Sequence, residues 1–304
     1  EVFFTEKPSE LMFYYQTHSP QNYAMRVKMK PYIYFRDFEE LCKKDSLEEL
    51  IAELKYRGLD ANYVMDFSKG LPLICSAASH ASTKIIKTLI DFGADINVRD
   101  FDGDTPLADA VSNPEAVKIF LDMNADVNSP NNWGRTPLMK AAEFNSIDTI
   151  KMLIEHGAYV NSKDQNGSTV FMHIDPYGDP QSNLQTLQVL IDAGADVNAK
   201  DNNGRTVLMH FMPDEYTEDC YIVPLIKAGS DVNAQNNDGE TVLGIATRDL
   251  LYYFDSDYYL KHLITDLIKA GARGDIRDKS GYCPIEDEKY GKDIRALIKK
   301  YQKK

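Results

Sequence analysis

Several features are scarce or missing in this 304-residue sequence. No apolar run reaches 18 residues, so no segment predicts a membrane-spanning helix. There are only four cysteines and no CxxC pair, which excludes a disulfide framework or a paired-cysteine zinc site. Lysine and arginine number 34 against 47 aspartates and glutamates, giving a net charge of −13. That balance disfavours binding to nucleic acid or to an anionic membrane. It is compatible with a basic partner, and the alternative is that the charge only keeps a long surface soluble.

Motifs that carry catalysis are absent as well. The sequence has no glycine-rich phosphate loop, no HExxH, no GxSxG and no paired Cys/His clusters. Carboxylates are plentiful, but most recur at one place in a repeated unit, as Asp95, Asp126, Asp196 and Asp231 do. A residue that recurs in this way is expected to hold a turn through hydrogen bonds. The sequence therefore predicts no enzymatic activity, no cofactor and no metal site.

The cysteines and the first residue bear on the compartment. Cys75 and Cys283 fall in segments expected to pack inside the fold, as small buried thiols. Scattered reduced cysteines favour the cytoplasm. The chain begins with Glu1 rather than Met, which favours an exported or periplasmic product or a piece of a longer protein. The sequence leaves the compartment open.

The sequence does contain a unit repeated about every 33 residues, clearest at 131–163. From a Gly or Asn to the next Thr the spacing is always 12 residues, as from Gly157 to Thr169. From that Thr to the following Gly or Asn the spacing varies between 19 and 30 residues. A fixed period decides the architecture before any local pattern does.

Each unit predicts two helices and a tight turn. In residues 131–163, Thr136-Pro137 begins the first helix, because Thr caps well and Pro is tolerated in the first turn. Gly157 ends the second helix, and Asn166-Gly167 marks a turn. The second helix carries an amphipathic stripe: Ile147, Ile150, Leu153 and Ile154.

The unit resembles the ankyrin repeat, whose T-P-L-H-x-A and G-A-D-V-N signatures appear as TPLADA, TPLMKAA, GADIN, NADVN and GADVN. The match covers roughly 66–277, and weaker flanking units extend it to 35–304. The resemblance implies an all-α solenoid of about eight helix-turn-helix units with hairpin-like tips. The expected units are 35–65, 66–99, 100–130, 131–163, 164–200, 201–235, 236–277 and 278–304.

The chain departs from the family pattern after Thr-Pro-Leu, where Met139, Met172 and Met209 replace the usual His. In two neighbouring units a His follows one place later, as His173 and His210. Successive repeats lie roughly 10 Å apart, so we expect these imidazoles to be satisfied within the stack rather than to share a metal.

Residues 1–34 are not repeat. Apolar and basic residues alternate from Tyr23 to Lys30, which predicts a strand. The exposed first unit of a repeat array needs a cover, so we expect this segment to be a cap. A partner-binding segment is the competing interpretation.

The resemblance also implies that a protein partner binds the concave face, formed by the tips and the first helices. Trp133 is the only tryptophan and is expected at an exposed tip beside Arg135; Trp and Arg are enriched at interface hot spots. The alternative is that Trp133 packs on its neighbouring tips. The candidate contact residues on this side are Phe101, Asp102, Asn132, Trp133, Arg135, Phe144, Asn203, Arg205 and Asp238.

A second candidate surface comes from three insertions, around 175–183, 213–220 and 249–259. They are acidic and rich in tyrosine, and adjacent units should place them side by side as a ridge. The alternative is that they extend helices and pack their aromatic rings locally. The candidate contact residues here are Tyr177, Tyr216, Tyr252 and Tyr253, and Tyr221 is expected nearby.

The sequence thus predicts a monomeric, non-enzymatic scaffold that binds a protein through the concave face. The alternative is an inhibitor or immunity-type protein that blocks an enzyme through the acidic, tyrosine-rich loops.

Overall fold

The computed structural model describes residues 46–56, 59–64, 71–80, 82–212, 221–248 and 257–302, together with Phe38, Cys42 and Lys44. Within these residues every regular element is a helix. Extended backbone pairs only in two isolated bridges, Val64 with Pro72 and Lys200 with Thr206. The all-α prediction is confirmed. No helix in the described ranges is long and apolar enough to cross a membrane.

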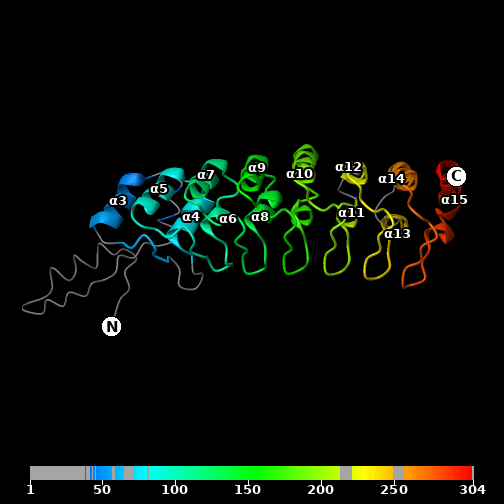
Figure 1. Ribbon diagram of the computed structural model, residues 1–304, viewed down its shortest axis with the longest axis horizontal. Helices are drawn as coiled ribbons and strands as arrows, with labels where there is room; N and C mark the ends of the chain where they lie inside the picture. Colours follow the sequence, from blue (N-terminus) through cyan, green and yellow to red (C-terminus); the bar gives the residue numbers. More distant parts are fainter. Residues whose placement is uncertain are drawn as a thin grey trace, which may run out of the picture.

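The helices form two rows along one elongated array (Figure 1). The inner row consists of α4 (Leu73–Ser79), α6 (Pro106–Asp109), α8 (Pro137–Glu143), η1 (Val170–His173), α11 (Val207–His210), α13 (Val242–Arg248) and η3 (Pro284–Glu286). The outer row consists of α3 (Leu47–Tyr56), α5 (Thr83–Asp91), α7 (Pro114–Asp122), α9 (Ile147–Glu155), α10 (Pro180–Asp192), α12 (Ile222–Lys227), α14 (Asp257–Lys269) and α15 (Gly291–Tyr301). A loop that we call a finger joins each outer helix to the next inner one, and the fingers project side by side along one edge of the array (Figure 1).

Four inner helices, α6, α8, η1 and α11, have a threonine N-cap, as the sequence predicted. The Thr105 Oγ1 accepts a hydrogen bond from the Ala108 backbone N–H at 3.3 Å, and Thr136 accepts one from Met139 at 3.4 Å. Proline occupies the first helical turn after both caps. The inner helices are short, four residues in α6 and α11, and unit 164–200 has only a 3-10 turn there. Such helices are marginal alone, so packing against neighbouring units holds them.

Outer helices bury one stripe against the inner row. In α9, Ile150 and Leu153 are fully buried, whereas Ile147 and Ile154 are only partly buried. The helix ends where predicted: Gly157 has a φ of +87°. Glycine adopts this left-handed conformation without a steric penalty.

Part of the insertion that we expected as an exposed ridge is helix and core. Residues 180–192 form α10, which at 13 residues is longer than the nine-residue α5, α7 and α9. Its Asn183 is buried, and the Nδ2 donates to the Tyr221 hydroxyl at 2.9 Å. Tyr221 is 1% exposed and packs on Phe211, with ring centroids 5.1 Å apart. The expectation that Tyr221 lies on a surface ridge is therefore wrong, because its ring is buried against Phe211 and its hydroxyl accepts from Asn183.

The described residues leave some expectations untested. Tyr216, Tyr252 and Tyr253 lie outside them, as does the expected cap, 1–34. At the other end, α15 buries Ile294 and carries basic residues in its last turn. Of the four cysteines, Cys42, Cys75 and Cys283 are described, and all three are buried. The predicted burial of Cys75 and Cys283 is confirmed.

Candidate protein-binding surface

An aspartate or asparagine at the first tip position holds each finger. In the finger of unit 164–200, the Asp164 Oδ1 accepts hydrogen bonds from the backbone N–H groups of Asn166 and Ser168, both at 2.8 Å. These two hydrogen bonds to one carboxylate oxygen hold the backbone of the turn closed. The same pattern recurs at Asp100, Asn131, Asp201, Asn236 and Asp278.

Neighbouring fingers are also bonded to each other. The Asn132 backbone N–H donates to the Asp102 carbonyl at 2.9 Å, and the Asn132 Nδ2 donates to the Phe101 carbonyl at 3.0 Å. Gln165 repeats this one unit further, with its Nε2 donating to the Asn132 carbonyl at 2.7 Å. The fingers therefore form one hydrogen-bonded ribbon whose tips stand at fixed spacing.

A second set of bonds links the units at the base of the fingers. The Asn161 Nδ2 donates to the Gly194 carbonyl at 3.1 Å, and its Oδ1 accepts from the Asp196 backbone N–H at 2.7 Å. The Asp196 Oδ1 in turn accepts from the Asn198 N–H at 2.9 Å. Asp95, Asp126 and Asp231 make the same bond as Asp196. The predicted turn-holding role of these recurring carboxylates is confirmed.

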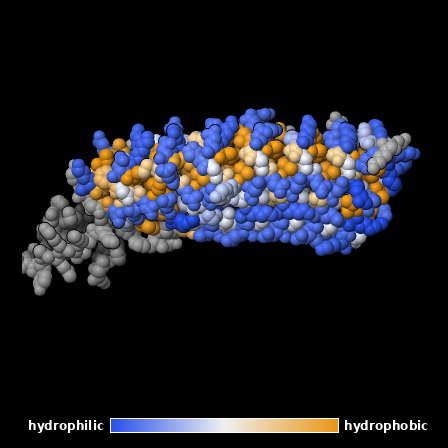
Figure 2. Space-filling view, viewed as in Figure 1, coloured by the Kyte–Doolittle hydropathy of each residue, from blue (hydrophilic) through white to orange (hydrophobic). Residues whose placement is uncertain are grey.

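The tip residues predicted as partner contacts reach the surface. Phe101 is 53% exposed and Trp133 is 48% exposed, at the tips of adjacent fingers. Asn132, Asn203, Arg205 and Asp238 are exposed, and Asp102 and Arg135 are partly exposed. The edge of the array formed by the fingers is almost entirely hydrophilic, whereas the apolar patches lie between the helices (Figure 2). Exposed aromatic tips are therefore unusual on this edge.

The structure does not bring all the predicted contacts together. Phe144 is the C-cap residue of α8, and Tyr177 lies in the turn before α10. These two side chains are 59% and 60% exposed. They lie at the turns between inner and outer helices. These two turns are close together, because a Cβ on Gly178 would lie 3.3 Å from the Asn145 Nδ2 of the preceding unit. The fingers lead into the opposite end of the inner helices, so Phe144 and Tyr177 form a separate surface.

The inner row carries a column of polar side chains that the sequence had not revealed as one feature. At the fifth place from the Thr position of successive units stand Cys75, Asp109, Lys140, His173 and His210. The shared repeat position was the available signal, but only the two histidines stood out against the family pattern.

Lys140 lies between two carboxylates of the preceding unit. Its Nζ is 2.8 Å from the Asp104 Oδ2 and 3.4 Å from the Asp109 Oδ1. Burial raises the pKa of Asp109 to about 7, and the ammonium of Lys140 only partly opposes this. Among the described residues, Asp100, Asp104 and Asp109 form a group of carboxylates whose oxygens lie within 4.8 Å of one another. The cation that the structure places against this group is Lys140.

The two histidines are held neutral. The His173 Nε2 is 3.2 Å from the Asp164 Oδ2, and both side chains are almost fully buried. The pKa of His173 is lowered to about 4, mainly by burial and also by the nearby Arg135, while Asp164 opposes the shift. Burial also lowers the pKa of His210. A neutral imidazole beside the residue that closes a finger is a structural contact of the stack.

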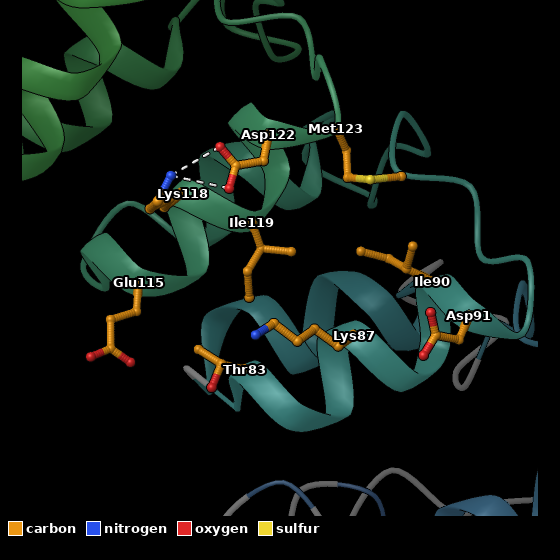
Figure 3. A pocket seen from close by; sticks show the side chains of 9 residues that line it. All are labelled: Thr83, Lys87, Ile90, Asp91, Glu115, Lys118, Ile119, Asp122 and Met123. Carbon is orange, nitrogen blue, oxygen red and sulfur yellow. Dashed lines mark hydrogen bonds and ion pairs between the residues drawn. The ribbon is translucent and has the colours of Figure 1, made fainter.

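A groove of about 420 Å³ lies in the outer row, between α5 and α7 (Figure 3). Ile90, Ile119 and Met123 supply its apolar part, and Lys118 forms an ion pair with Asp122 at 3.0 Å on its rim. Its charged residues show no convergent arrangement suited to catalysis (Figure 3). The groove is a surface feature of the outer row.

Comparison with known proteins agrees with this geometry. Residues 40–131 and 74–164 match a family model described as ankyrin repeats in three copies. The crystal structure of the ankyrin repeat domain of Bcl-3, titled a unique member of the IkappaB protein family, is similar to this chain with a TM-score of 0.60. The two are 21% identical, and the match covers 73% of this chain and 97% of that one. A comparison with curated protein sequences gave no match.

Residues 40–164 thus match the ankyrin-repeat family, and the described helices form an ankyrin-repeat solenoid. Ankyrin repeats are in general modules for protein–protein interaction, and their fold is typical of proteins without enzymatic activity. A protein partner is therefore consistent with the family.

Proposed function

We propose that this chain is a non-enzymatic scaffold that binds a folded protein partner through its inner face, the surface made by the finger tips and the inner row. The observation that carries the proposal is the hydrogen-bonded finger ribbon. It presents Phe101, Trp133, Asn203 and Asp238 as a rigid series of exposed side chains. Contact groups that are already ordered lose little conformational entropy when a partner binds.

Trp133 and Arg135 are the expected anchors. Trp133 is a large, half-exposed aromatic residue, and Arg135 lies within 3.5 Å of Glu143, which orients its guanidinium over α8. Truncation of a tryptophan hot spot costs about 2 kcal/mol or more of binding free energy, roughly a 30-fold loss of affinity.

The test is partner capture with the double variant Trp133→Ala/Arg135→Ala. We expect at least a tenfold loss of the captured partner, and a thermal midpoint close to that of the unsubstituted chain because both side chains are at the surface. The matched control is Phe144→Ala/Tyr177→Ala, which removes two exposed aromatic rings from the helix–helix turns.

The control also tests the second candidate, an inhibitor that acts through the tyrosine-rich connections. The exposed Tyr177 favours that candidate, and the burial of Tyr221 counts against it. Loss of capture in Phe144→Ala/Tyr177→Ala, with full capture by the Trp133/Arg135 variant, would move the binding site to the turns and overturn the inner-face proposal.

A further inference from the structure

The most acidic repeat unit of the chain is 100–130. Residues 100–130 contain seven aspartates and glutamates and one lysine, a net charge of −6 out of the −13 of the whole chain. The following unit, 131–163, contains three acidic and four basic residues. Units 164–200 and 201–235 carry a net charge of −4 each, so unit 100–130 is the strongest of several acidic units.

Four of those carboxylates gather at the inner face. Asp100 and Asp102 belong to the finger, Asp104 follows it, and Asp109 ends α6. Lys140 is the cation that contacts this group, and the Asp104 Oδ1 and Asp109 Oδ2 are buried without a hydrogen-bond partner. The side chain of Asp104 is only 8% exposed. Asp109 is partly neutral near pH 7, because its pKa is raised to about 7, but one ammonium still does not neutralise the three carboxylates of Asp100, Asp102 and Asp104.

The pKa shifts of the surrounding groups have burial and neighbouring carboxylates as their causes. Burial raises the pKa values of Asp100 and Asp102, and the neighbouring carboxylate of Asp104 raises them further. Burial and the carboxylates of Asp109 and Asp100 raise the pKa of the Cys75 thiol. Burial should lower the pKa of Lys140, yet the two aspartates outweigh it and the pKa is raised. Only the raised pKa of Lys140 runs against the effect of burial, so this shift is the one that indicates a negative potential.

Two exposed aromatic rings adjoin these carboxylates. Phe101 precedes Asp102 in the same finger, and Trp133 stands at the tip of the finger bonded to it through Asn132. The faces of aromatic rings attract cations, and indole does so best. The equivalent tip positions of the next two fingers hold only amides: Gln165, Asn166, Asn202 and Asn203.

We propose that Phe101, Asp102 and Trp133, backed by Asp100, Asp104 and Asp109, form an acidic–aromatic patch that binds a basic peptide segment of the partner. An arginine side chain suits the patch best, because its planar guanidinium stacks on an aromatic face while it donates to a carboxylate. Arg135 bounds the patch on the side of unit 131–163, where its charge is directed to Glu143. This inference rests on the proposed function, since it names the chemistry of the partner at the same inner face.

The probe is a hexa-arginine peptide, with hexa-glutamate as the reverse-charge control. Trp133 is the only tryptophan, so its emission reports contact at the patch itself. We expect hexa-arginine to change that emission and hexa-glutamate to leave it unchanged. The affinity should fall at least tenfold between 50 and 300 mM NaCl, because screening weakens exposed charge pairs.

Asp102→Asn is the decisive variant, and Phe101→Ala is a second one that leaves the charge intact. Each should weaken hexa-arginine binding about three- to tenfold. The matched control is Asp238→Asn, which removes one charge at the same tip position of unit 236–277. It should change the affinity less than twofold. Circular dichroism verifies that all three variants fold.

Equal losses in Asp102→Asn and Asp238→Asn, or an unchanged emission of Trp133, would show a diffuse attraction to an acidic protein and overturn the patch. Failure of the proposed function looks different. If hexa-arginine binds the patch but the Trp133/Arg135 variant still captures the partner fully, the inner face is not the docking site. If capture needs Trp133 but hexa-arginine does not bind, the docking site stands and its basic chemistry is wrong.

Discussion

At the residue scale, the most consequential groups are the titratable side chains buried between fingers and inner helices. His173 has its pKa lowered to about 4 by burial, and Asp109 has its pKa raised to about 7 by burial. Both shifts favour the neutral form, which is the form that a low-dielectric interior accepts. The stability of the fold therefore depends on pH through the buried side chains of His173 and Asp109.

We predict that His173 makes the fold lose stability as the pH falls from about 6.5 towards 4. The unfolded chain binds the proton near the ordinary histidine pKa of about 6.5, whereas the folded chain resists protonation until about pH 4. The loss is on the order of 2–3 kcal/mol. Urea unfolding at pH 7.0 and 4.5 measures it.

Because carboxylates elsewhere also respond to acid, the comparison is with His173→Gln. This variant should lose less stability between the two pH values than the unsubstituted chain. An identical loss in both chains would mean that His173 does not titrate as its burial requires.

At the element scale, the finger ribbon is the feature that separates this array from a simple stack of helix pairs. Backbone bonds join successive tips, as between Gln165 and Trp133 at 2.9 Å and between Asn202 and Asn166 at 2.8 Å. The close approach needs glycine: a Cβ on Gly167 would lie 2.5 Å from the Asn202 Oδ1 and 2.8 Å from its backbone nitrogen. The tight packing of the tips is thus set by an inter-unit contact as well as by the turn.

We predict that Gly167→Ala destabilises the array more than Gly157→Ala. Both glycines have positive φ, +75° and +87°, so both substitutions incur backbone strain of about 1–2 kcal/mol. Only Gly167→Ala also meets the neighbouring finger, because nothing lies within 4 Å of a Cβ on Gly157. Chemical denaturation of the two variants gives the difference.

Amide hydrogen exchange locates the effect. We expect the backbone amides of Asn202 and Gln165 to exchange faster in Gly167→Ala. In Gly157→Ala, the exchange rates of the finger amides should be unchanged. Equal destabilisation and equal exchange in both variants would mean that the inter-finger bonds add nothing to the turn itself.

The sequence was sufficient for the parts of the fold that repeat. The Thr136 cap, the Gly157 stop and the recurring Asp196 turn all appear as the spacing predicted, because each is determined within a few residues. The candidate site was predictable only in part. Trp133 and Phe101 are exposed as expected, but the ion cluster of Lys140 joins residues 31 and 36 positions away. Tyr221 was misplaced because the partner of its hydroxyl, Asn183, lies 38 residues away in the preceding unit.

At the scale of the whole molecule, the array is quasi-one-dimensional, so each unit contacts mainly its neighbours (Figure 1). A central unit supports two neighbours, whereas a terminal unit supports one. In unit 278–304, the Gln302 Nε2 reaches the Ile268 and Ala272 carbonyls, both at 2.9 Å, and ties the last helix to α14.

We predict that equivalent cavities have unequal consequences along the array. Leu153→Ala in α9 and Ile294→Ala in α15 each empty a fully buried site, at a local cost of about 2–5 kcal/mol. Leu153→Ala should lower the midpoint temperature of the main unfolding transition of the array. Ile294→Ala should leave that transition nearly in place and speed hydrogen exchange only within residues 278–304. A uniform loss of protection in both variants would show that the array unfolds as a single cooperative unit.

The finger ribbon has a further consequence, for how such a chain can change its specificity. Its inter-finger bonds use backbone atoms and the amide of the second tip residue, whereas at the third tip position the side chains of Trp133, Asn166, Asn203 and Asp238 make no hydrogen bond in the described structure. Those positions can therefore accept new side chains while the register of the array stays the same. The residues that would contact a partner are thus adjacent to the residues that stabilise the ribbon, and a substitution at one position need not affect the other.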